Sequence, residues 1–288
     1  MLQQDRARKT LGSGRRILNF LLTFVLAYVV ALFLIRVFES HFIFFPNVPD
    51  RLAGDWNPRG LGAEDVWISS MDGTRLHAWW IPGKNARYTF LAFHGNAANI
   101  ANRADVYRFL ANTPANVLAV EYRGYGKSEG KPSESGIYRD ADGAYRYLIE
   151  KKGIPPEQII SFGQSLGTAF ATHLAAKEKV AGLVLEAPFP SASVVARKAF
   201  WFLPGISLLV YGQFDTGSAI QNVTAPVMVV HCTQDPVIPF EMGEAVFQSA
   251  RSPKVFVKIE GYCHEEASLI SPAHYSRALA DFLQSLKR

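Results

Sequence analysis

The segment Gly163-Gln164-Ser165-Leu166-Gly167 constrains the fold of this chain more than any other stretch. An apolar run, residues 158–162, precedes it, and an alanine-rich stretch, residues 168–176, follows it. This order predicts a strand, a sharp turn and a helix. Glycine suits both ends of such a turn because strand and helix crowd together there, and the serine between them takes a strained backbone conformation. We therefore expect Ser165 to be a nucleophile at the carboxyl end of a strand, where helix N–H groups favour negative charge.

The chain from residue 64 onward alternates between apolar strands and helices. Seven further strands are expected, at residues 64–69, 75–81, 88–93, 116–121, 180–185, 226–231 and 254–259. Asp72-Gly73 lies between the first two and predicts a hairpin. Continuous apolar strands separated by helices are typical of a parallel sheet covered on both faces. The predicted fold class is therefore α/β, with a mostly parallel eight-stranded sheet in one domain, residues 64–288.

Residues 17–35 form an apolar stretch that is long enough to cross a membrane. Only Asn19, Thr23 and Tyr28 interrupt its apolar character. As a helix it would measure roughly 28 Å at about 1.5 Å per residue, close to the thickness of a bilayer's hydrocarbon core. We predict an N-terminal transmembrane helix that serves as a signal anchor. A cleaved signal peptide is the alternative, disfavoured by the length of the apolar core and by the lack of a small-x-small cleavage site.

The basic residues are concentrated before this stretch. Residues 1–16 hold five basic residues against Asp5 and so carry +4 of the formal net charge of +5. Positive charge before a span predicts a cytoplasmic N-terminus and a domain on the periplasmic or exoplasmic side of a single-pass membrane protein. Because residues 17–288 carry only +1, the composition gives no case for nucleic-acid binding by the folded domain.

A linker is expected between the span and the domain, at residues 36–63. Its aromatic residues Phe42, Phe44 and Phe45 either lie in the membrane interface or pack against the domain. The sequence leaves both interpretations open.

The turns after the last two predicted strands offer an acid and a base for Ser165. Asp235 follows one of these strands and His264 follows the other. A serine nucleophile needs a base that accepts its proton and an acid that orients the base. The chain order Ser, Asp, His also fits a known triad arrangement. We predict a catalytic triad of Ser165, Asp235 and His264, with Glu186 as the competing acid.

Acyl transfer also requires hydrogen-bond donors for the developing oxyanion. The backbone N–H of Leu166, directly after the nucleophile, is one candidate, and the N–H of Asn96 in the loop after the third strand is the other. His94 is interpreted as a brace of that loop and Arg123 as a member of a structural ion pair. No metal site is predicted, because no pair of histidines has ligand spacing beside carboxylates or thiols.

These motifs together resemble the α/β-hydrolases, and within them the membrane-anchored, small-lid serine hydrolases of the bud-emergence-suppressor type. The matching segments are Asp72-Gly73, residues 78–82, His94-Gly95-Asn96-Ala97, residues 122–130, residues 163–167, residues 226–235 and residues 261–264. The resemblance covers nearly everything after the predicted anchor. It implies an α/β-hydrolase fold and hydrolysis of carboxylic esters or thioesters without a metal or organic cofactor.

Two cysteines depart from the pattern of this group, which usually has glycine at these positions. Cys232 and Cys263 lie in the loops that carry the predicted acid and base. We consider a disulfide that braces these loops, although two free thiols are favoured because a disulfide requires Cα atoms within about 7 Å.

The only sizeable insertion spans about residues 189–224. Its stretch of residues 199–211 is rich in aromatic and aliphatic side chains. It is too short and too interrupted by proline for a second membrane span. We predict that Trp201 and Phe202 shape an apolar acyl pocket, with a core helix as the alternative.

The sequence thus predicts a membrane-tethered serine hydrolase that acts on a small acyl ester or a lipid-like substrate. A serine peptidase that uses the same triad is one alternative, weakened because no propeller or large lid domain is present to select a peptide end. A noncatalytic, membrane-anchored binding protein on a hydrolase scaffold is the other, and the intact triad speaks against it.

Overall fold

The structure is a computed structural model that describes residues 2–37, 43–203, 205 and 214–286. Eight strands form one sheet in the order β1-β2-β4-β3-β5-β6-β7-β8. Their bounds are Glu64–Ser69 (β1), Arg75–Ile81 (β2), Tyr88–Phe93 (β3), Ala115–Val120 (β4), Ile159–Gln164 (β5), Gly182–Glu186 (β6), Val227–Cys232 (β7) and Lys254–Ile259 (β8). Strand β2 runs antiparallel to both β1 and β4, whereas β3 to β8 pair in parallel. The predicted eight-stranded, mostly parallel sheet with an antiparallel edge is confirmed.

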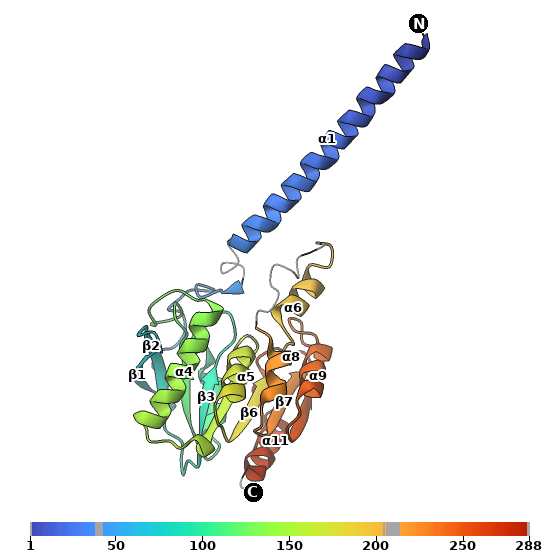
Figure 1. Ribbon diagram of the computed structural model, residues 1–288. Coiled ribbons are helices and arrows are strands. Elements are labelled where there is room, and N and C mark those ends of the chain that lie inside the picture. The colour runs from blue at the N-terminus through green and yellow to red at the C-terminus, as the bar shows by residue number, and fades with distance from the viewer. Residues whose placement is uncertain (1, 38–42, 204, 206–213, 287–288) are drawn as a thin grey trace.

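Helices cover both faces of this sheet (Figure 1). Helices α4, α5 and α9 contribute to the apolar core on one face, and α3, α10 and α11 to the core on the other. The bounds of the domain's helices are Ala104–Ala111 (α3), Glu134–Glu150 (α4), Gly167–Lys177 (α5), Ala192–Ala199 (α6), Thr216–Ala219 (α8), Phe240–Ser249 (α9), Ala267–Ile270 (α10) and Pro272–Ser285 (α11). Short 3₁₀ helices lie at Ile100–Arg103, Pro156–Gln158 and Ile220–Asn222.

The central strands are largely apolar because both of their faces are buried, and β4 shows the pattern. In β4, Leu118 and Val120 belong to one core, whereas Val117 and Ala119 belong to the other. Successive side chains of a strand point to opposite faces, so a strand between two helical layers needs apolar residues at every position. This geometry explains why the strands appear in the sequence as continuous apolar runs.

The predicted hairpin at Asp72-Gly73 is present, and side-chain caps begin two of the helical segments. The Ser133 side chain caps α4 by accepting a hydrogen bond from the Gly136 N–H at 3.2 Å. Asp72-Gly73 forms the turn of the β1–β2 hairpin. The segment that leads from Asn99 into α3 begins as a 3₁₀ turn, whose Ala101 N–H donates to the Asn99 side chain, and becomes α-helical at Ala104.

Helix α1 (Leu2–Val37) precedes the domain and includes a strongly apolar stretch, Arg15–Leu34, with a mean hydropathy of 2.6. This stretch is long and apolar enough to cross a membrane, and a signal sequence would have the same properties. Figure 1 shows α1 projecting from the domain at the end where α6 lies.

The predicted linker packs against the domain from Ile43 onward. Phe44 is buried and its ring lies 5.9 Å from that of Phe214. Phe45 is 40% exposed and forms an isolated β-bridge with Ala97, in the loop after β3. Of the two interpretations of the linker aromatics, packing against the domain is therefore correct for Phe44, while Phe42 lies outside the described residues.

Candidate active site

The turn between β5 and α5 has the strained geometry expected for a nucleophile. Ser165 has a φ of 48°, in the left-handed region that non-glycine residues rarely adopt. A Cβ atom at Gly163 would overlap the carbonyl oxygen of Gly167, and one at Gly167 would overlap that of Phe93. Both glycines are therefore required by the close approach of helix and strand, which keeps Ser165 at the carboxyl end of β5.

The structure brings Ser165, His264 and Asp235 together in one hydrogen-bonded line. The Nε2 atom of His264 lies 2.9 Å from the Ser165 Oγ, and its Nδ1 atom lies 2.8 Å from the Asp235 Oδ2. With the proton on Nδ1, the imidazole donates to Asp235 and accepts from the Ser165 hydroxyl. This arrangement can deprotonate Ser165 when an acyl group approaches.

Asp235 is firmly oriented by the backbone of its own loop. Its Oδ1 atom accepts hydrogen bonds from the N–H groups of Val237 and Ile238, both at 2.8 Å, and its side chain is fully buried. Burial acts to raise the pKa of Asp235, but hydrogen bonds from His231 and His264 outweigh this effect and hold the pKa well below its usual range. Asp235 is therefore ionised throughout the physiological range.

His264 lies in an acidic environment. Burial acts to lower the pKa of this imidazole, but the hydrogen bond to Asp235 and the negative charges of Glu265, Asp235 and Glu266 raise it above its usual value. The carboxylates thus stabilise the imidazolium that forms when His264 accepts a proton.

The two predicted oxyanion donors remain unpaired in the structure. Neither the N–H of Leu166 nor that of Asn96 donates a hydrogen bond to another described residue. The side chain of Asn96 holds its loop in place, because it donates to the Ile43 carbonyl and accepts from the Phe45 N–H at 3.3 Å and from the Tyr125 hydroxyl at 3.0 Å. The linker that follows α1 thus contributes directly to this loop.

Several contacts around the site have no local signal in the sequence. Arg103 donates to the Ala97 carbonyl and to the Glu265 carboxylate, both at 2.9 Å, and so connects the loop after β3 with the loop that carries His264. These residues are far apart in the chain, and no motif marks them. Only homologous sequences that vary in a correlated way could have revealed the pair.

Comparison with known proteins agrees with this geometry. A family described as having the alpha/beta hydrolase fold matches residues 88–207. Alpha/beta hydrolase domain-containing protein 17C of Mus musculus is 32% identical over 244 residues, which cover 82% of this chain and 73% of that protein. The chain belongs to the α/β-hydrolase family. An uncharacterized protein of Mycobacterium tuberculosis is also 32% identical, over 85% of this chain and 87% of its own length.

Solved structures of α/β hydrolases have the same fold. A Pyrococcus furiosus esterase matches with a TM-score of 0.66 at 20% identity, over 82% of this chain and 97% of that chain. A Vibrio vulnificus alpha-beta hydrolase matches with a TM-score of 0.64 at 25% identity, over 76% of this chain and 81% of that chain. The fold and its relatives support hydrolase activity for this chain.

Glu186 does not take the place of Asp235 in this hydrolase. Its carboxyl oxygens accept hydrogen bonds from Gln164 and from the backbone of Ala267, whereas the partner of His264 Nδ1 is Asp235. His94 pairs with the buried Glu121 at 3.0 Å, in agreement with a bracing role.

The structural role expected for Arg123 is confirmed by its ion pairs. Its guanidinium contacts Asp140 at 2.6 Å and Asp72 at 2.9 Å. It thereby joins the loop after β4 to α4 and to the β1–β2 turn.

The two cysteines of the hydrolase form a disulfide between Cys232 and Cys263, with Cα atoms 5.7 Å apart. This pairing agrees with the bracing hypothesis and corrects the preference for two free thiols. The two cysteines meet because β7 and β8 are parallel neighbours, so that their carboxyl ends lie side by side. The sequence alone does not show that these two strands are neighbours.

Three consecutive aromatic residues of the insertion, Phe200 to Phe202, are exposed, whereas Phe189 and Phe214 are buried. Trp201 is 81% exposed and Phe202 is 59% exposed, and their rings contact each other. Residues 206–211 of the predicted acyl-pocket stretch lie outside the described residues. The acyl-pocket role of Trp201 and Phe202 stays a prediction.

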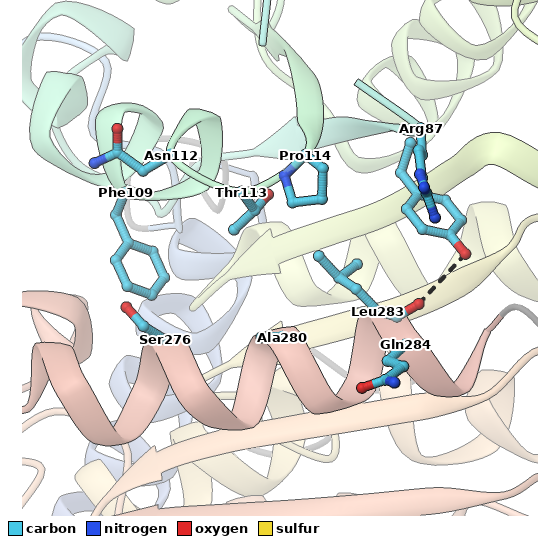
Figure 2. Close-up of a pocket in the computed structure, with 10 residues that line it drawn as sticks. Arg87, Phe109, Asn112, Thr113, Pro114, Ser276, Ala280, Leu283 and Gln284 are labelled. Carbon is cyan, nitrogen blue, oxygen red and sulfur yellow. Dashed lines mark hydrogen bonds between the residues drawn. The ribbon is translucent and has the colours of Figure 1, made fainter. Parts of the chain in front are cut away.

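A hollow of about 360 Å³ lies elsewhere, between α3 and α11 (Figure 2). Tyr88, the first residue of β3, lines it and donates a hydrogen bond to the Leu283 carbonyl at 3.3 Å. The hollow therefore lies at the amino ends of the strands, away from Ser165. Among the described residues, no group of three or more His, Cys, Asp or Glu side chains could hold a metal ion.

Proposed function

We propose that this α/β hydrolase is a membrane-anchored serine hydrolase that cleaves carboxylic esters or thioesters. The observation that carries the proposal is the hydrogen-bonded line from Ser165 through His264 to Asp235. A serine in a strained turn, a base within 3 Å of its hydroxyl and a buried, ionised acid together fit nucleophilic acyl transfer.

The first half of the proposed reaction forms an acyl-enzyme. The Ser165 Oγ attacks the acyl carbonyl carbon while its proton passes to the His264 Nε2. The carbonyl oxygen becomes negative and accepts hydrogen bonds from the Leu166 and Asn96 N–H groups. The bond from the acyl carbon to the leaving group then breaks, and His264 donates the proton to the departing alcohol or thiol.

The second half regenerates the enzyme. A water molecule gives a proton to His264 and attacks the acyl carbon, which releases the carboxylic acid and returns the proton from His264 to the Ser165 oxygen. Asp235 keeps His264 in the productive tautomer through both halves. No redox step or cofactor enters this sequence of reactions.

The membrane part of the proposal rests on α1 and on charge. Residues 1–16 form a basic cytoplasmic segment, residues 17–35 cross the membrane, and the catalytic domain lies on the periplasmic or exoplasmic side. A small acyl ester or a lipid-like molecule is the proposed substrate class. Protease treatment of intact cells or spheroplasts tests the topology: the domain should be digested, and a protected domain would contradict this orientation.

A fluorophosphonate probe tests the serine mechanism directly. We expect the probe to label the wild-type protein at Ser165, and Ser165→Ala to abolish both labelling and ester hydrolysis. Ser249→Ala, a half-buried serine on α9, is the matched control and should keep both. Labelling that persists in Ser165→Ala, or a folded wild type that is never labelled, would refute the proposal. A panel of esters, thioesters and peptides then distinguishes the acyl classes.

A further inference from the structure

A buried carboxyl group lies directly beside the proposed nucleophile. Glu186 is the last residue of β6, and only 1% of it is exposed. Its register partner on β5 is Gln164, which is fully buried and directly precedes Ser165. The two side chains meet at the carboxyl edge of the sheet, where the Gln164 Nε2 donates to the Glu186 Oε2 at 3.1 Å.

The same carboxyl group holds the loop that carries His264. The Glu186 Oε1 accepts a hydrogen bond from the Ala267 N–H at 3.1 Å. The Gln164 Nε2 also donates to the Glu265 carbonyl at 3.2 Å. The buried side chains of Gln164 and Glu186 therefore connect the turn that carries Ser165 with the loop that carries His264.

The backbone of Glu186 contributes to the same connection. Its carbonyl oxygen accepts the Ser165 N–H at 2.9 Å. Glu186 thus contacts the nucleophile turn through its backbone and the histidine loop through its side chain, so a shift of this residue would change the distance between Ser165 and His264.

The environment of Glu186 favours a neutral carboxylic acid. Its described hydrogen-bond donors, Gln164 and Ala267, are both uncharged. The pKa of Glu186 is raised to about 8, and burial is the largest cause. The hydrogen bonds from these donors act to lower the pKa, whereas the negative charges of Glu265 and Glu266 act to raise it. Tyr275 of α11 is another titratable group beside Glu186. Burial raises the pKa of Tyr275 well above its usual value, and a negative charge on Glu186 acts in the same direction.

We infer that Glu186 is a positioning residue that, as a neutral acid, holds the His264 loop against the Ser165 turn. This inference rests on the proposed function, because the distance it controls matters only if His264 deprotonates Ser165. A neutral acid can accept both N–H groups without a net charge. Its ionisation would strengthen these two hydrogen bonds, but it would also bury a negative charge that repels Glu265 and Glu266 of the same loop. We expect the burial cost and this repulsion to outweigh the stronger hydrogen bonds, so that the loop loosens.

The pH dependence of ester hydrolysis tests this role. We expect kcat/KM of the wild type to fall above about pH 8, as Glu186 ionises. Glu186→Gln, which mimics the neutral acid, should keep activity near neutral pH and lose the alkaline fall. Glu244→Gln, an exposed carboxylate on α9, is the matched control and should keep the wild-type profile. An alkaline fall that is unchanged in Glu186→Gln would overturn the inference.

Removal of both acceptors gives a second test. Glu186→Leu leaves the Gln164 and Ala267 N–H groups without this partner, and misplacement of a catalytic group by about 1 Å can cost on the order of 10²-fold in rate. We expect a loss of this size in kcat with little change in KM. A wild-type kcat in Glu186→Leu would contradict the role, and if this variant does not fold, Glu186→Gln still decides.

Hydrogen exchange separates this inference from the proposed mechanism. In the inactive Ser165→Ala protein, amide protection of residues 264–270 should decrease above about pH 8, after correction for intrinsic exchange, whereas residues 104–111 of α3 should stay protected. In Ser165→Ala combined with Glu186→Gln, the decrease should be absent. If both proteins lose protection equally, Glu186 does not hold the loop, whatever the outcome of the labelling experiment.

Discussion

At the residue scale, the chemistry centres on an imidazole among carboxylates. In the proposed mechanism, His264 must be neutral to accept the proton of Ser165, so we expect kcat/KM to decrease as the pH falls through the pKa of His264. The neighbouring carboxylates raise that pKa above its usual value, and the acidic limb of the profile should therefore lie at a higher pH than for an unperturbed histidine. Glu265, the next residue in the chain, is one source of this shift.

Glu265→Gln should move the acidic limb to lower pH. The substitution removes a negative charge that stabilises the imidazolium, so the pKa of His264 falls and the neutral base persists further into the acidic range. The amide oxygen can still accept from Arg103. The measurement is kcat/KM between pH 5 and 8, with Glu244→Gln as the control, and an unmoved limb would show that the charge of Glu265 does not reach His264.

Asp235→Asn should leave the fold intact and nearly abolish turnover. The amide can no longer hold His264 in the tautomer that accepts from Ser165, and the comparable change in a serine protease costs about 10⁴-fold in kcat. Steady-state kinetics and thermal unfolding are compared with those of Asp281→Asn, an exposed acid on α11. Loss of less than about tenfold would point to another acid partner for His264.

At the element scale, the disulfide joins the ends of two neighbouring strands. Cys232 ends β7, three residues before Asp235, and Cys263 directly precedes His264. The sequence separation of 31 residues corresponds, in a chain-entropy estimate, to a stabilisation of about 3 to 4 kcal/mol. The disulfide should therefore stabilise the domain and limit the movement of the acid loop relative to the base loop.

Replacement of both cysteines by serine tests this element. The Cys232→Ser, Cys263→Ser protein should lose about 2 to 4 kcal/mol in its free energy of unfolding, measured with urea. The wild type treated with a reductant should approach the same value, whereas the reductant should not affect the double variant. Equal stability of the oxidised wild type and the double variant would show that the disulfide does not constrain the unfolded chain.

At the scale of the whole molecule, the proposed membrane helix and the active site are close neighbours. Five residues, 38–42, separate Val37, the end of α1, from Ile43, whose carbonyl accepts from Asn96, so the chain takes six residue steps between them. An extended chain spans at most about 3.6 Å per residue, so this path cannot exceed roughly 22 Å. The active-site end of the domain must therefore stay near the bilayer that would hold α1.

Trp201 should contact that bilayer. It is highly exposed, follows α6, and belongs to an insertion whose residue Phe214 packs on Phe44 of the linker. The chain has five tryptophans, and the other four lie at positions 56, 67, 79 and 80, on or near the first two strands. In nanodiscs with brominated lipids, the full-length wild type should show quenching that Trp201→Phe loses.

Trp67→Phe provides the control for this experiment, because Trp67 is 42% exposed on β1, at the edge of the sheet. Quenching that survives in Trp201→Phe but disappears in Trp67→Phe would place the sheet edge, not the insertion, against the lipid. A chain that does not reconstitute at all would instead contradict the anchoring role of α1.

Features that depend on short-range sterics and periodicity can be predicted from the amino-acid pattern. The Gly163 to Gly167 turn, the Ser133 cap and the Asp72-Gly73 hairpin each require particular residues within a few positions, so the pattern specifies the local geometry. Apolar runs and glycine turns also sufficed for the fold class. The chain order of Ser165, Asp235 and His264 predicts a catalytic triad, and in the structure His264 lies within hydrogen-bond distance of both other side chains.

Contacts between residues that are far apart in the chain depend on how the strands and helices pack. Strand order brings Cys232 beside Cys263, and the register of β5 with β6 brings Gln164 beside Glu186. Such contacts depend on how whole elements pack, and many pairs of polar residues at strand ends are equally compatible with the sequence pattern. The raised pKa of Glu186 likewise follows from its burial, which is a property of the assembled domain and not of its neighbours in the chain.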